Sequence, residues 1–172
     1  IEITKNIKDI QTARYYSAAL MKNGDLWTWG SMAAMDKYHA IDSSLYTPKT
    51  PSVFMTNVKE FVLTDTYYAA IKNDGTLWMW GCDTNGELGI GDCELNNFFP
   101  RQVNIPKRVK KVILSNKGWN KTAAITEDGD LYMWGDNSVY GLGIGENSDN
   151  SKSYNTPQKV NGISDVSDVS IC

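Results

Sequence analysis

The stretch that decides the fold is Asp25-Leu26-Trp27-Thr28-Trp29-Gly30, because it occurs three times. It returns as Thr76-Leu77-Trp78-Met79-Trp80-Gly81 and as Asp130-Leu131-Tyr132-Met133-Trp134-Gly135. The closing glycines stand at positions 30, 81 and 135, so the period is 51 and then 54 residues. A period of this length is typical of a stacked array of supersecondary units. The repeat therefore favours a protein that presents binding surfaces over one with a single catalytic cleft.

The composition sets the broad class of the protein. The chain has 172 residues, of which 41% are hydrophobic, so it can bury a core. It has no apolar run of about 18 residues, which a membrane-spanning helix would need. The net charge of −3 argues against broad binding of nucleic acid. Because the chain begins at Ile1 rather than Met, we expect a processed form or an expressed fragment.

Each repeat begins with a short segment in which apolar and polar residues alternate, the pattern of a half-buried β-strand. These segments are Asn6–Ile10, Asn57–Phe61, Arg108–Val112 and, at the end of the chain, Asp165–Val169. A second strand follows at Ser17–Leu20, Tyr68–Ile71 and Thr122–Ile125. Each second strand holds a pair of alanines, so we expect neighbouring sheets to pack closely there.

A turn of Asn-Gly or Asp-Gly separates the second strand from the third. The three turns are Asn23-Gly24, Asp74-Gly75 and Asp128-Gly129. These dipeptides predict hairpins with type I′ turns, in which both central residues have positive φ. The third strand is the tryptophan stretch. Both of its faces carry large apolar side chains, as expected of a strand that lies between two neighbouring sheets.

A loop then leads to a segment with proline, which is Thr47-Pro48, Phe99–Val103 or Thr156–Val160. Proline fits an edge strand because it cannot donate a hydrogen bond to a neighbour. Four short antiparallel strands per repeat make one blade of a β-propeller. The sequence thus predicts an all-β chain that forms an open, partial propeller of about three blades. Residues 1–172 form a single array, with repeats at 6–56, 57–107 and 108–164 and a fourth that begins at 165–172.

These repeats resemble the regulator of chromosome condensation repeat family. The family pattern is Ser-x-Ala-Leu, two residues, Asp-Gly, a strand ending in Trp-Gly, then Asn-x-x-Gly-Gln-Leu-Gly-x-Gly and later Pro-x-x-Val. The second repeat matches at Trp80-Gly81, Gly86–Gly91 and Pro100–Val103, and the third at Trp134-Gly135, Asn137, Leu142–Gly145 and Pro157–Val160. Tyr140 and Gly141 stand where the family has Gly and Gln. The first repeat departs most, since its loop 31–47 lacks Leu-Gly-x-Gly.

The resemblance carries expectations about assembly and function. Members of the family include a GTPase exchange factor, a plant photoreceptor, segments of ubiquitin ligases and a secreted inhibitor of β-lactamase. They share a propeller, usually of seven blades, that presents loops to a protein partner. Three blades leave apolar faces and strand edges uncovered. We therefore expect the chain to be a fragment of a longer protein, or its copies to associate through the open blade edges.

The loops between the first and second strands hold our candidates for a protein-binding surface. They are Arg14, Tyr15, Tyr16, Tyr67, Trp119 and Lys121. Aromatic and arginine side chains dominate the energetics of protein interfaces. Because the family has histidine at the position of Tyr16 and Tyr67, the alternative is that their hydroxyls bond the next blade. Trp119 lies in a loop that is longer than its counterparts (14 steps from Val109 to Ala123, 11 from Val58 to Ala69), so we expect it to be exposed.

For the other conspicuous residues we favour structural roles. Trp29, Trp80 and Trp134 recur at one place per repeat, as core residues do, rather than forming a ligand-stacking or light-absorbing cluster. The glycine-rich segments 86–91 and 141–145 open no helix, so we predict turns and not phosphate loops. The basic run 107–111 suits the solvent face of a strand. The acidic loops 83–92 and 146–149 lack the ligand spacing of a calcium loop.

The sequence indicates no catalytic, cofactor or metal site. His39 is the sole histidine and has no nucleophile motif near it. Cys82 and Cys93 flank one loop, and a disulfide between them stays open as an alternative.

We therefore predict a non-enzymatic protein–protein interaction module that forms part of a larger bacterial protein. We expect a protein partner, no cofactor, no membrane insertion and no nucleic acid, and we favour a location outside the cell or at its surface. Two alternatives stay open. One is a regulator or inhibitor of a partner enzyme, like the β-lactamase inhibitor or the GTPase exchange factor in the family. The other is a structural repeat of a cell-surface protein.

Overall fold

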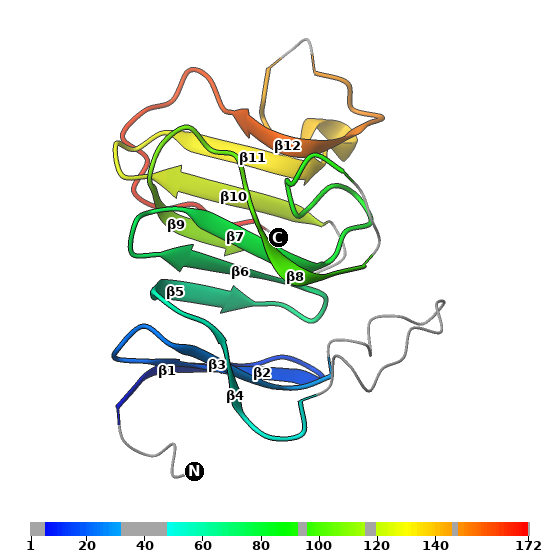
Figure 1. Cartoon of the computed structure of the whole chain (residues 1–172). Helices are drawn as coiled ribbons and strands as arrows, with labels where there is room; N and C mark the ends of the chain where they lie inside the picture. The colour runs from blue at the N-terminus through cyan, green and yellow to red at the C-terminus, as the bar shows by residue number, and fades with distance from the viewer. Residues whose placement is uncertain (1–5, 32–47, 93–95, 116–119, 146–147, 172) are drawn as a thin grey trace.

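Three antiparallel sheets follow one another along the chain (Figure 1). The computed structural model describes residues 6–31, 48–92, 96–115, 120–145 and 148–171. In these residues each sheet has four strands in chain order, and we call the sheets blade 1, blade 2 and blade 3. The predicted all-β fold of three four-stranded blades is confirmed.

The strands have the following bounds. Blade 1 consists of β1 (Ile7–Thr12), β2 (Tyr16–Met21), β3 (Leu26–Gly30) and β4 (Ser52–Met55). Blade 2 consists of β5 (Val58–Leu63), β6 (Tyr67–Lys72), β7 (Leu77–Cys82) and β8 (Asn96–Gln102). Blade 3 consists of β9 (Val109–Leu114), β10 (Lys121–Thr126), β11 (Leu131–Asp136) and β12 (Ser153–Lys159), with a short 3-10 helix, η3 (Ser138–Tyr140), before β12.

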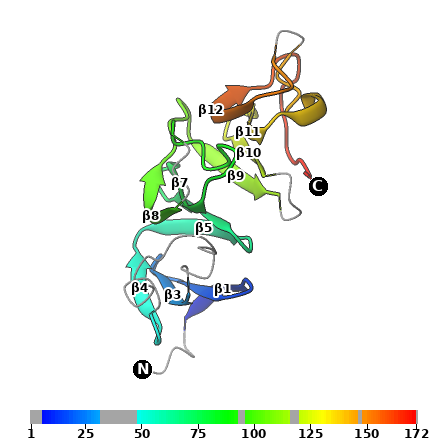
Figure 2. The same cartoon turned by 90° about the vertical axis from the view of Figure 1, so that its right-hand side faces the viewer.

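The blades lie side by side on an open arc (Figure 2). In that view β1 and β9 lie on one side of the arc, while β4, β8 and β12 lie on the other. The described chain therefore forms a sector of a propeller, in which each blade packs its faces against its neighbours along the arc. Blade 2 is the only one of the three with a described blade on both sides.

Each interface between blades is an apolar layer made from both sheets. Leu77 and Met79 of β7 lie in the core between blades 2 and 3, whereas Trp80 of the same strand lies in the core between blades 1 and 2. This confirms the expectation that both faces of the tryptophan strand are apolar. Trp80 and Trp134 are fully buried, as predicted of core residues, but Trp29 is only half-buried. No described blade precedes blade 1, so the face that carries Trp29 has no neighbouring blade among the described residues.

The alanine pairs of the second strands are buried, and four of the six alanines lie in the cores between blades, namely Ala18, Ala69, Ala70 and Ala124. All six alanines have no exposed surface: Ala18, Ala19, Ala69, Ala70, Ala123 and Ala124. A small side chain lets the sheets approach, and the aromatic side chains on the neighbouring strands fill the remaining space.

The hairpin turns are not of the predicted type. In each turn the glycine has positive φ (89° at Gly24, 83° at Gly75, 82° at Gly129), but the preceding Asn or Asp is not among the residues with positive φ. The glycine N–H donates to the carbonyl three residues earlier, as from Gly24 to Met21 at 3.0 Å. This is a type I turn followed by a left-handed glycine, so the type I′ prediction is wrong. In the first two turns the Asn or Asp instead accepts from the backbone N–H two residues later, as at Asp74 and Thr76 (2.9 Å). In the third turn the N–H of Asp130 donates to the Thr126 hydroxyl at 3.0 Å.

The same glycines also tie each blade to the next. The carbonyl of Gly24 accepts from the N–H of Val58 at 2.8 Å, and the carbonyl of Gly75 accepts from Val109 at 2.8 Å. At the end of the chain Gly129 accepts from Val166 at 3.0 Å. Residues 165–171 therefore leave blade 3 as a first strand would, but they form no strand, contrary to the prediction. A strand needs a hydrogen-bonded partner, and no described strand lies beside this segment to provide one.

The fourth strands correct one assignment from the sequence. Ser52 pairs with Thr28, Arg101 with Met79 and Gln158 with Met133, at equivalent places of the three blades. The proline equivalent to Pro100 and Pro157 is therefore Pro51, and not Pro48 as the Thr47-Pro48 segment predicted. The loop of the first repeat, 31–47, lacks the Leu-Gly-x-Gly motif that would have aligned its proline with those of the other repeats. Its residues 32–47 lie outside the described residues.

The close approach at Gly81 yields a test of the packing. Gly81 has φ of 116°, and a Cβ there would lie 2.6 Å from the carbonyl oxygen of Thr66. We expect Gly81→Ala to lower the free energy of unfolding by about 3 kcal/mol, through backbone strain and the clash together. Gly91 has φ of 90° with nothing within 4 Å of a Cβ. Gly91→Ala is therefore the matched control and should cost about 1 kcal/mol. Urea denaturation measures both, and equal losses would contradict the role of close approach.

Candidate protein-binding site

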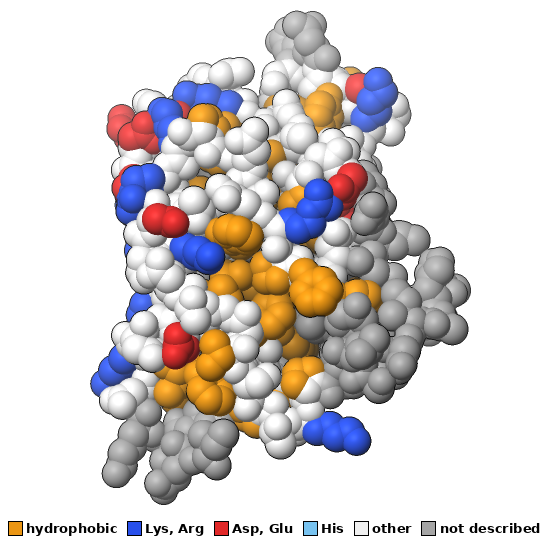
Figure 3. All heavy atoms as spheres, viewed as in Figure 1, with side chains coloured by type: hydrophobic (Ala, Val, Ile, Leu, Met, Phe, Trp, Pro, Cys, Tyr) orange, Lys and Arg blue, Asp and Glu red, His pale blue; other side chains and the backbone are white. Residues whose placement is uncertain are grey.

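The hairpin end of the array is charged, and several of its charges form ion pairs. This end holds the β2–β3, β6–β7 and β10–β11 turns, at the left of Figure 1, where Figure 3 shows Lys, Arg, Asp and Glu side chains. Lys107 contacts Asp130 at 2.6 Å, and Arg108 contacts Glu127 at 2.9 Å. Lys111, in β9, contacts Asp168 at 2.6 Å. The basic run thus serves contacts within the chain, in line with the structural role that we favoured for it.

The loop end, opposite the hairpin end, holds the first predicted pair of site residues. Arg14 and Tyr15 lie between β1 and β2, and both are exposed. Tyr15 is 48% exposed, and the Arg14 guanidinium lies 5.0 Å from the centre of its ring. The backbone N–H of Arg14 donates to Asp65 of blade 2 at 3.2 Å, which fixes this loop to its neighbour. A cation stacked on an exposed ring is a preformed contact surface of the kind that interfaces use.

Two of the predicted site residues are buried. Tyr16 and Tyr67 are each 1% exposed, so neither contributes to an outer surface. The Tyr67 hydroxyl lies 2.9 Å from the carbonyl of Lys121 and 3.0 Å from that of Ser115, both in blade 3, and donates its hydrogen there. This is the alternative role, a bond to the next blade. The Tyr16 ring packs 4.9 Å from that of Tyr68, centre to centre, in the core between blades 1 and 2.

The remaining predicted residues fall on blade 3. Trp119 lies outside the described residues, so its predicted exposure stays a prediction. Lys121 is half-buried in β10, at the position of Tyr16 and Tyr67 in the other blades. Its side chain runs against Gly141, where a Cβ would lie 2.8 Å from the Lys121 ammonium nitrogen. Lys121 therefore belongs to the same surface as the loop that follows β11.

That loop contains two consecutive non-glycine residues with positive φ. Val139 and Tyr140 have φ of 51° and 60°, although neither is glycine. Each such residue costs roughly 1–2 kcal/mol. Both are also exposed, by 84% and 54%. Strain of this kind, with two apolar side chains held out into solvent, is typical of functional surfaces. The sequence signal was the departure from family glycine at Tyr140, which we noted but did not interpret as a site.

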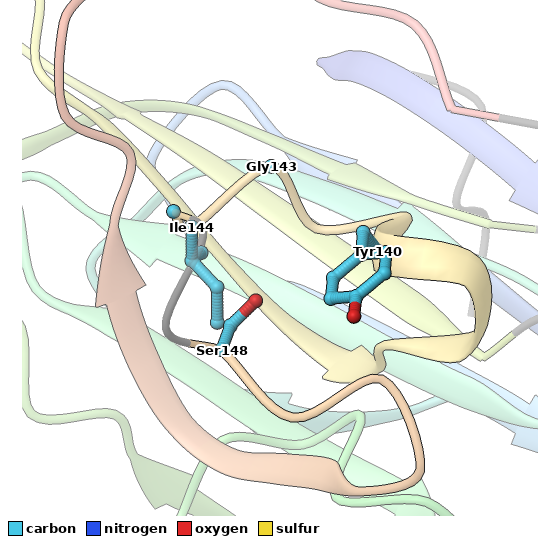
Figure 4. Close-up of a pocket in the computed structure, with 5 residues that line it drawn as sticks. Tyr140, Gly143, Ile144 and Ser148 are labelled. Carbon is cyan, nitrogen blue, oxygen red and sulfur yellow. The ribbon is translucent and has the colours of Figure 1, made fainter.

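A pocket of about 500 Å³ lies beside the strained turn. Its lining residues are Tyr140, Gly143, Ile144, Gly145 and Ser148. The Tyr140 ring and the Ile144 side chain face each other across the pocket, with Ser148 on the returning segment between them (Figure 4). The walls are mainly apolar, with a hydroxyl and glycine peptide groups as polar partners. Such a pocket suits an apolar or aromatic side chain with one polar atom.

A buried acid lies at the equivalent loop of blade 2. Asp83 is fully buried, and its Oδ1 accepts from the N–H of Leu88 at 3.3 Å, while its Oδ2 has no partner among the described residues. In blade 3 the same place holds Asn137, whose Oδ1 accepts from Leu142 at 3.2 Å and whose Nδ2 donates to the carbonyl of Asp149 at 3.0 Å. Burial, with the negative charge of Glu87 nearby, raises the pKa of Asp83 to about 7. A proton on Asp83 makes it a donor, as the Asn137 amide is.

The other candidate chemistries find no support in the described chain. Within its residues no three His, Cys, Asp or Glu side chains are placed to hold a metal ion. None of its helices is long and apolar enough to cross a membrane. His39 and Cys93 lie outside the described residues, and with them the alternative of a Cys82–Cys93 disulfide.

Residues 74–125 and 128–171 match the model of the regulator of chromosome condensation (RCC1) repeat. The chain belongs to the RCC1 repeat family. The two matches begin near the hairpin turns at Asp74 and Asp128, so they include the tryptophan strands β7 and β11 and the glycine-rich loops of blades 2 and 3.

Several relatives share the repeat. The ultraviolet-B receptor UVR8 of Arabidopsis thaliana is 35% identical over 124 residues, which is 72% of this chain and 27% of UVR8. The human E3 ubiquitin-protein ligase HERC2 is 30% identical over 163 residues, 91% of this chain and 3% of HERC2. This chain therefore spans less than a third of either relative. A structure of yeast RCC1 (Prp20) with bound Kap60 superposes with a TM-score of 0.71 at 18% identity, over 94% of this chain and 39% of that one. The likeness confirms the propeller fold.

The buried acid predicts how stability depends on pH. The pKa of Asp83 is about 7 in the folded chain, against an ordinary value of 3.8 for an aspartate. Because folding raises the pKa, the stabilising proton is fully present below about pH 4 and is lost as the pH rises through about 7. We expect unfolding free energy to fall by on the order of 2 kcal/mol between about pH 5 and pH 8.

Asp83→Asn should remove most of this fall, since an amide donates at every pH. The reciprocal variant Asn137→Asp should acquire a similar fall in blade 3. Urea denaturation at a series of pH values measures both variants. An unchanged pH dependence in Asp83→Asn would show that other groups cause it.

Proposed function

We propose that this chain is a non-catalytic protein–protein interaction module that presents the loop end of its blades to a protein partner. The observation that carries the proposal is the exposed apolar turn of blade 3, where Val139 and Tyr140 hold positive φ beside a pocket. A fold has no packing reason to hold two apolar side chains in solvent at a cost in strain.

A second observation supports the same end of the molecule. The Arg14–Tyr15 stack on blade 1 adds an exposed aromatic and a cation, both fixed by the bond of Arg14 to Asp65. Tyr and Arg lose little conformational entropy on binding when they are already ordered. The surface would therefore bind through a few aromatic anchors on a rigid frame.

The relatives give this proposal a context. RCC1 (Prp20) has a protein, Kap60, bound to it in its structure, and a relative in Dictyostelium discoideum is Ras guanine nucleotide exchange factor C, 27% identical to this chain. A regulatory role on a partner enzyme is the second candidate. An exchange-factor role is tested by measuring nucleotide release from a purified small GTPase with and without the chain. An inhibitor role is tested by measuring β-lactam hydrolysis by a β-lactamase with and without the chain. We further propose that the chain is part of a larger bacterial protein. We also propose that this protein lies outside the cell or at its surface, where the chain could serve as a structural repeat.

The binding proposal is tested by capture from an extract of the native organism. Wild-type chain should retain a protein that the Arg14→Ala/Tyr15→Ala and Val139→Ser/Tyr140→Ser double variants retain at least about tenfold less, as expected for loss of two anchors. Lys107→Ala, at the hairpin end, is the matched surface control and should bind as wild type does. If the loop variants and wild type retain the same proteins in equal amount, the loop end is not the binding surface.

Self-association through the open blades is an additional candidate. Ile10 and Val53 of blade 1 are 54% and 47% exposed, on the blade that no described blade precedes. Association of copies would bury this surface. Light scattering over a range of concentrations should then show a mass above that of one chain, and Ile10→Lys should restore the single-chain mass. A stable monomer at all concentrations would rule out self-association.

A further inference from the structure

The loop after β7, residues 83–92, joins blade 2 to blade 3, and we call it the clasp. The carbonyl of Glu87 in the clasp accepts two hydrogen bonds from blade 3. One comes from the indole N–H of Trp134 in β11 at 2.9 Å, and the other from the hydroxyl of Thr122 in β10 at 2.7 Å. Both donors are fully buried, so a single peptide group of the clasp satisfies two polar groups of the next blade.

Further hydrogen bonds hold both ends of the clasp on blade 3. Near its start, the hydroxyl of Thr84 accepts from the side-chain amide of Asn120 at 2.7 Å. Near its end, the N–H of Gly91 donates to the carbonyl of Asn155 in β12 at 2.9 Å, and the Asn155 amide donates back to the Gly91 carbonyl at 3.0 Å. The clasp is therefore bonded to β10, β11 and β12 or to the residue just before them, and a movement of the clasp loosens the joint between the two blades.

The clasp is built around two buried carboxyl groups. Asp83 and Glu87 are 0% and 1% exposed, and they stand where the repeat pattern has the uncharged amides Asn and Gln. The Glu87 carboxylate accepts from the N–H of Asn85 at 2.6 Å and from the hydroxyl of Thr84 at 3.1 Å. Asp83 accepts from the N–H of Leu88 at 3.3 Å through one oxygen, while its other oxygen has no donor among the described residues.

The charged groups of blade 2 do not neutralise this pair. Arg101 of β8 pairs with Asp92 at 2.7 Å, and Asp92 itself adds a negative charge near Asp83. Tyr67 of β6, which faces Glu87, is uncharged and donates its hydroxyl hydrogen to blade 3.

The strands of blade 3 that contact the clasp bring no counter-charge either. Their charged side chains have other neighbours, which are Gly141 for Lys121, Ser138 for Asp136 and Asp130 for Lys159. Among the described residues, no Lys or Arg nitrogen lies within ion-pair distance of the Asp83 or Glu87 carboxyl.

A single proton makes this arrangement favourable. Two ionised carboxylates only accept hydrogen bonds, and in a buried site they repel each other strongly. With a proton on Asp83, its hydroxyl donates to Glu87, which lies within hydrogen-bond reach. Burial, and then the charge of Glu87, raises the pKa of Asp83 to about 7, so this proton is held in the folded chain at acidic pH and is lost above neutrality.

We propose that the clasp is a proton-operated latch between blades 2 and 3. It is closed while Asp83 and Glu87 share a proton, and it opens when the proton leaves and the two carboxylates repel each other. Opening withdraws the Glu87 carbonyl from Trp134 and Thr122, and loosens the joint while the sheets stay folded. The latch concerns the joint between two blades, and does not depend on which partner the loop end binds.

The test is hydrogen exchange of the full chain, followed by NMR at the indole N–H of Trp134 from about pH 5 to about pH 8. Each rate is divided by that of an unstructured peptide at the same pH, because exchange itself becomes faster as the pH rises. We expect the protection of this N–H to fall at least about tenfold over the range and to level off above about pH 7, where the closed clasp has also lost its proton. Protection that does not change with pH would overturn the latch.

Urea distinguishes opening of the latch from unfolding of the whole chain. Local opening exposes little surface, so the protection of the Trp134 indole should stay constant up to about 1 M urea. The backbone N–H of Ala70, in β6 and in the core between blades 1 and 2, is the reference. Its protection should be higher than that of the indole and should fall with urea. An equal dependence on urea at the two groups would show that the joint opens only when the chain unfolds, and the latch would be refuted.

Two variants identify the carboxyl pair as the cause. In Asp83→Asn the amide donates at every pH, so the protection of the Trp134 indole should not fall between about pH 5 and about pH 8. Glu87→Gln removes the repelling charge and should give the same result, and it tests the latch even if Asp83→Asn does not fold. Glu127→Gln is the matched control, since it removes an exposed carboxylate at the hairpin end and should behave as wild type does. A fall as large as that of wild type in either folded variant of the pair would assign the pH response to other groups and overturn the inference.

Discussion

The contact on which the rest of the structure depends is that of a tryptophan on the glycine loop of the preceding blade. Trp134 reaches from β11 to Gly89 and Glu87, and fills the space that a small residue leaves there. It requires a glycine with positive φ, a carbonyl directed outward and a buried leucine that holds the loop in place. The motif Leu-Gly-x-Gly supplies these requirements in blades 2 and 3. Sheets whose faces are otherwise flat and apolar thereby acquire a fixed register.

A contact that links each blade to the next is incomplete at the ends of any open array. The same residue type consequently lies in different surroundings along this chain. Trp80 and Trp134 are buried, while Trp29, on the first face, is half-buried. The position that holds Tyr67, with its hydroxyl bonded to blade 3, holds Lys121 in blade 3 itself. In blade 3, the last described blade, Tyr140 stands where blade 2 has Gly86.

The fold was predictable because its signals are local and are repeated. Period-two alternation located the first strands, the alanine pairs located the second, and the Asn-Gly and Asp-Gly dipeptides located the turns. The turn type was not predictable from the dipeptide alone, since Asn23 and Asp74 bond to the backbone two residues later instead of adopting positive φ. The proline of the first repeat was misassigned because the loop before it lacks the Leu-Gly-x-Gly motif that aligns the other two repeats. Tyr16 and Tyr67 were placed on the surface because the direction of a side chain at a strand end follows from the neighbouring blade, which the local sequence does not contain.

The sequence by itself determined that this protein is a stack of four-stranded blades, because strands, turns and repeat period depend on residues close together in the chain. It also determined that the tryptophans of the third strands belong to packing. Only the tertiary structure decided which copy of each repeated feature is covered and which is open. The glycine loops at Gly89 and Gly143 have nearly the same local backbone, yet one is covered by Trp134 and the other faces a pocket. That difference arises because burial is set by what another blade contributes, some 45 residues further along the chain in the case of Trp134 and Gly89 (134 − 89).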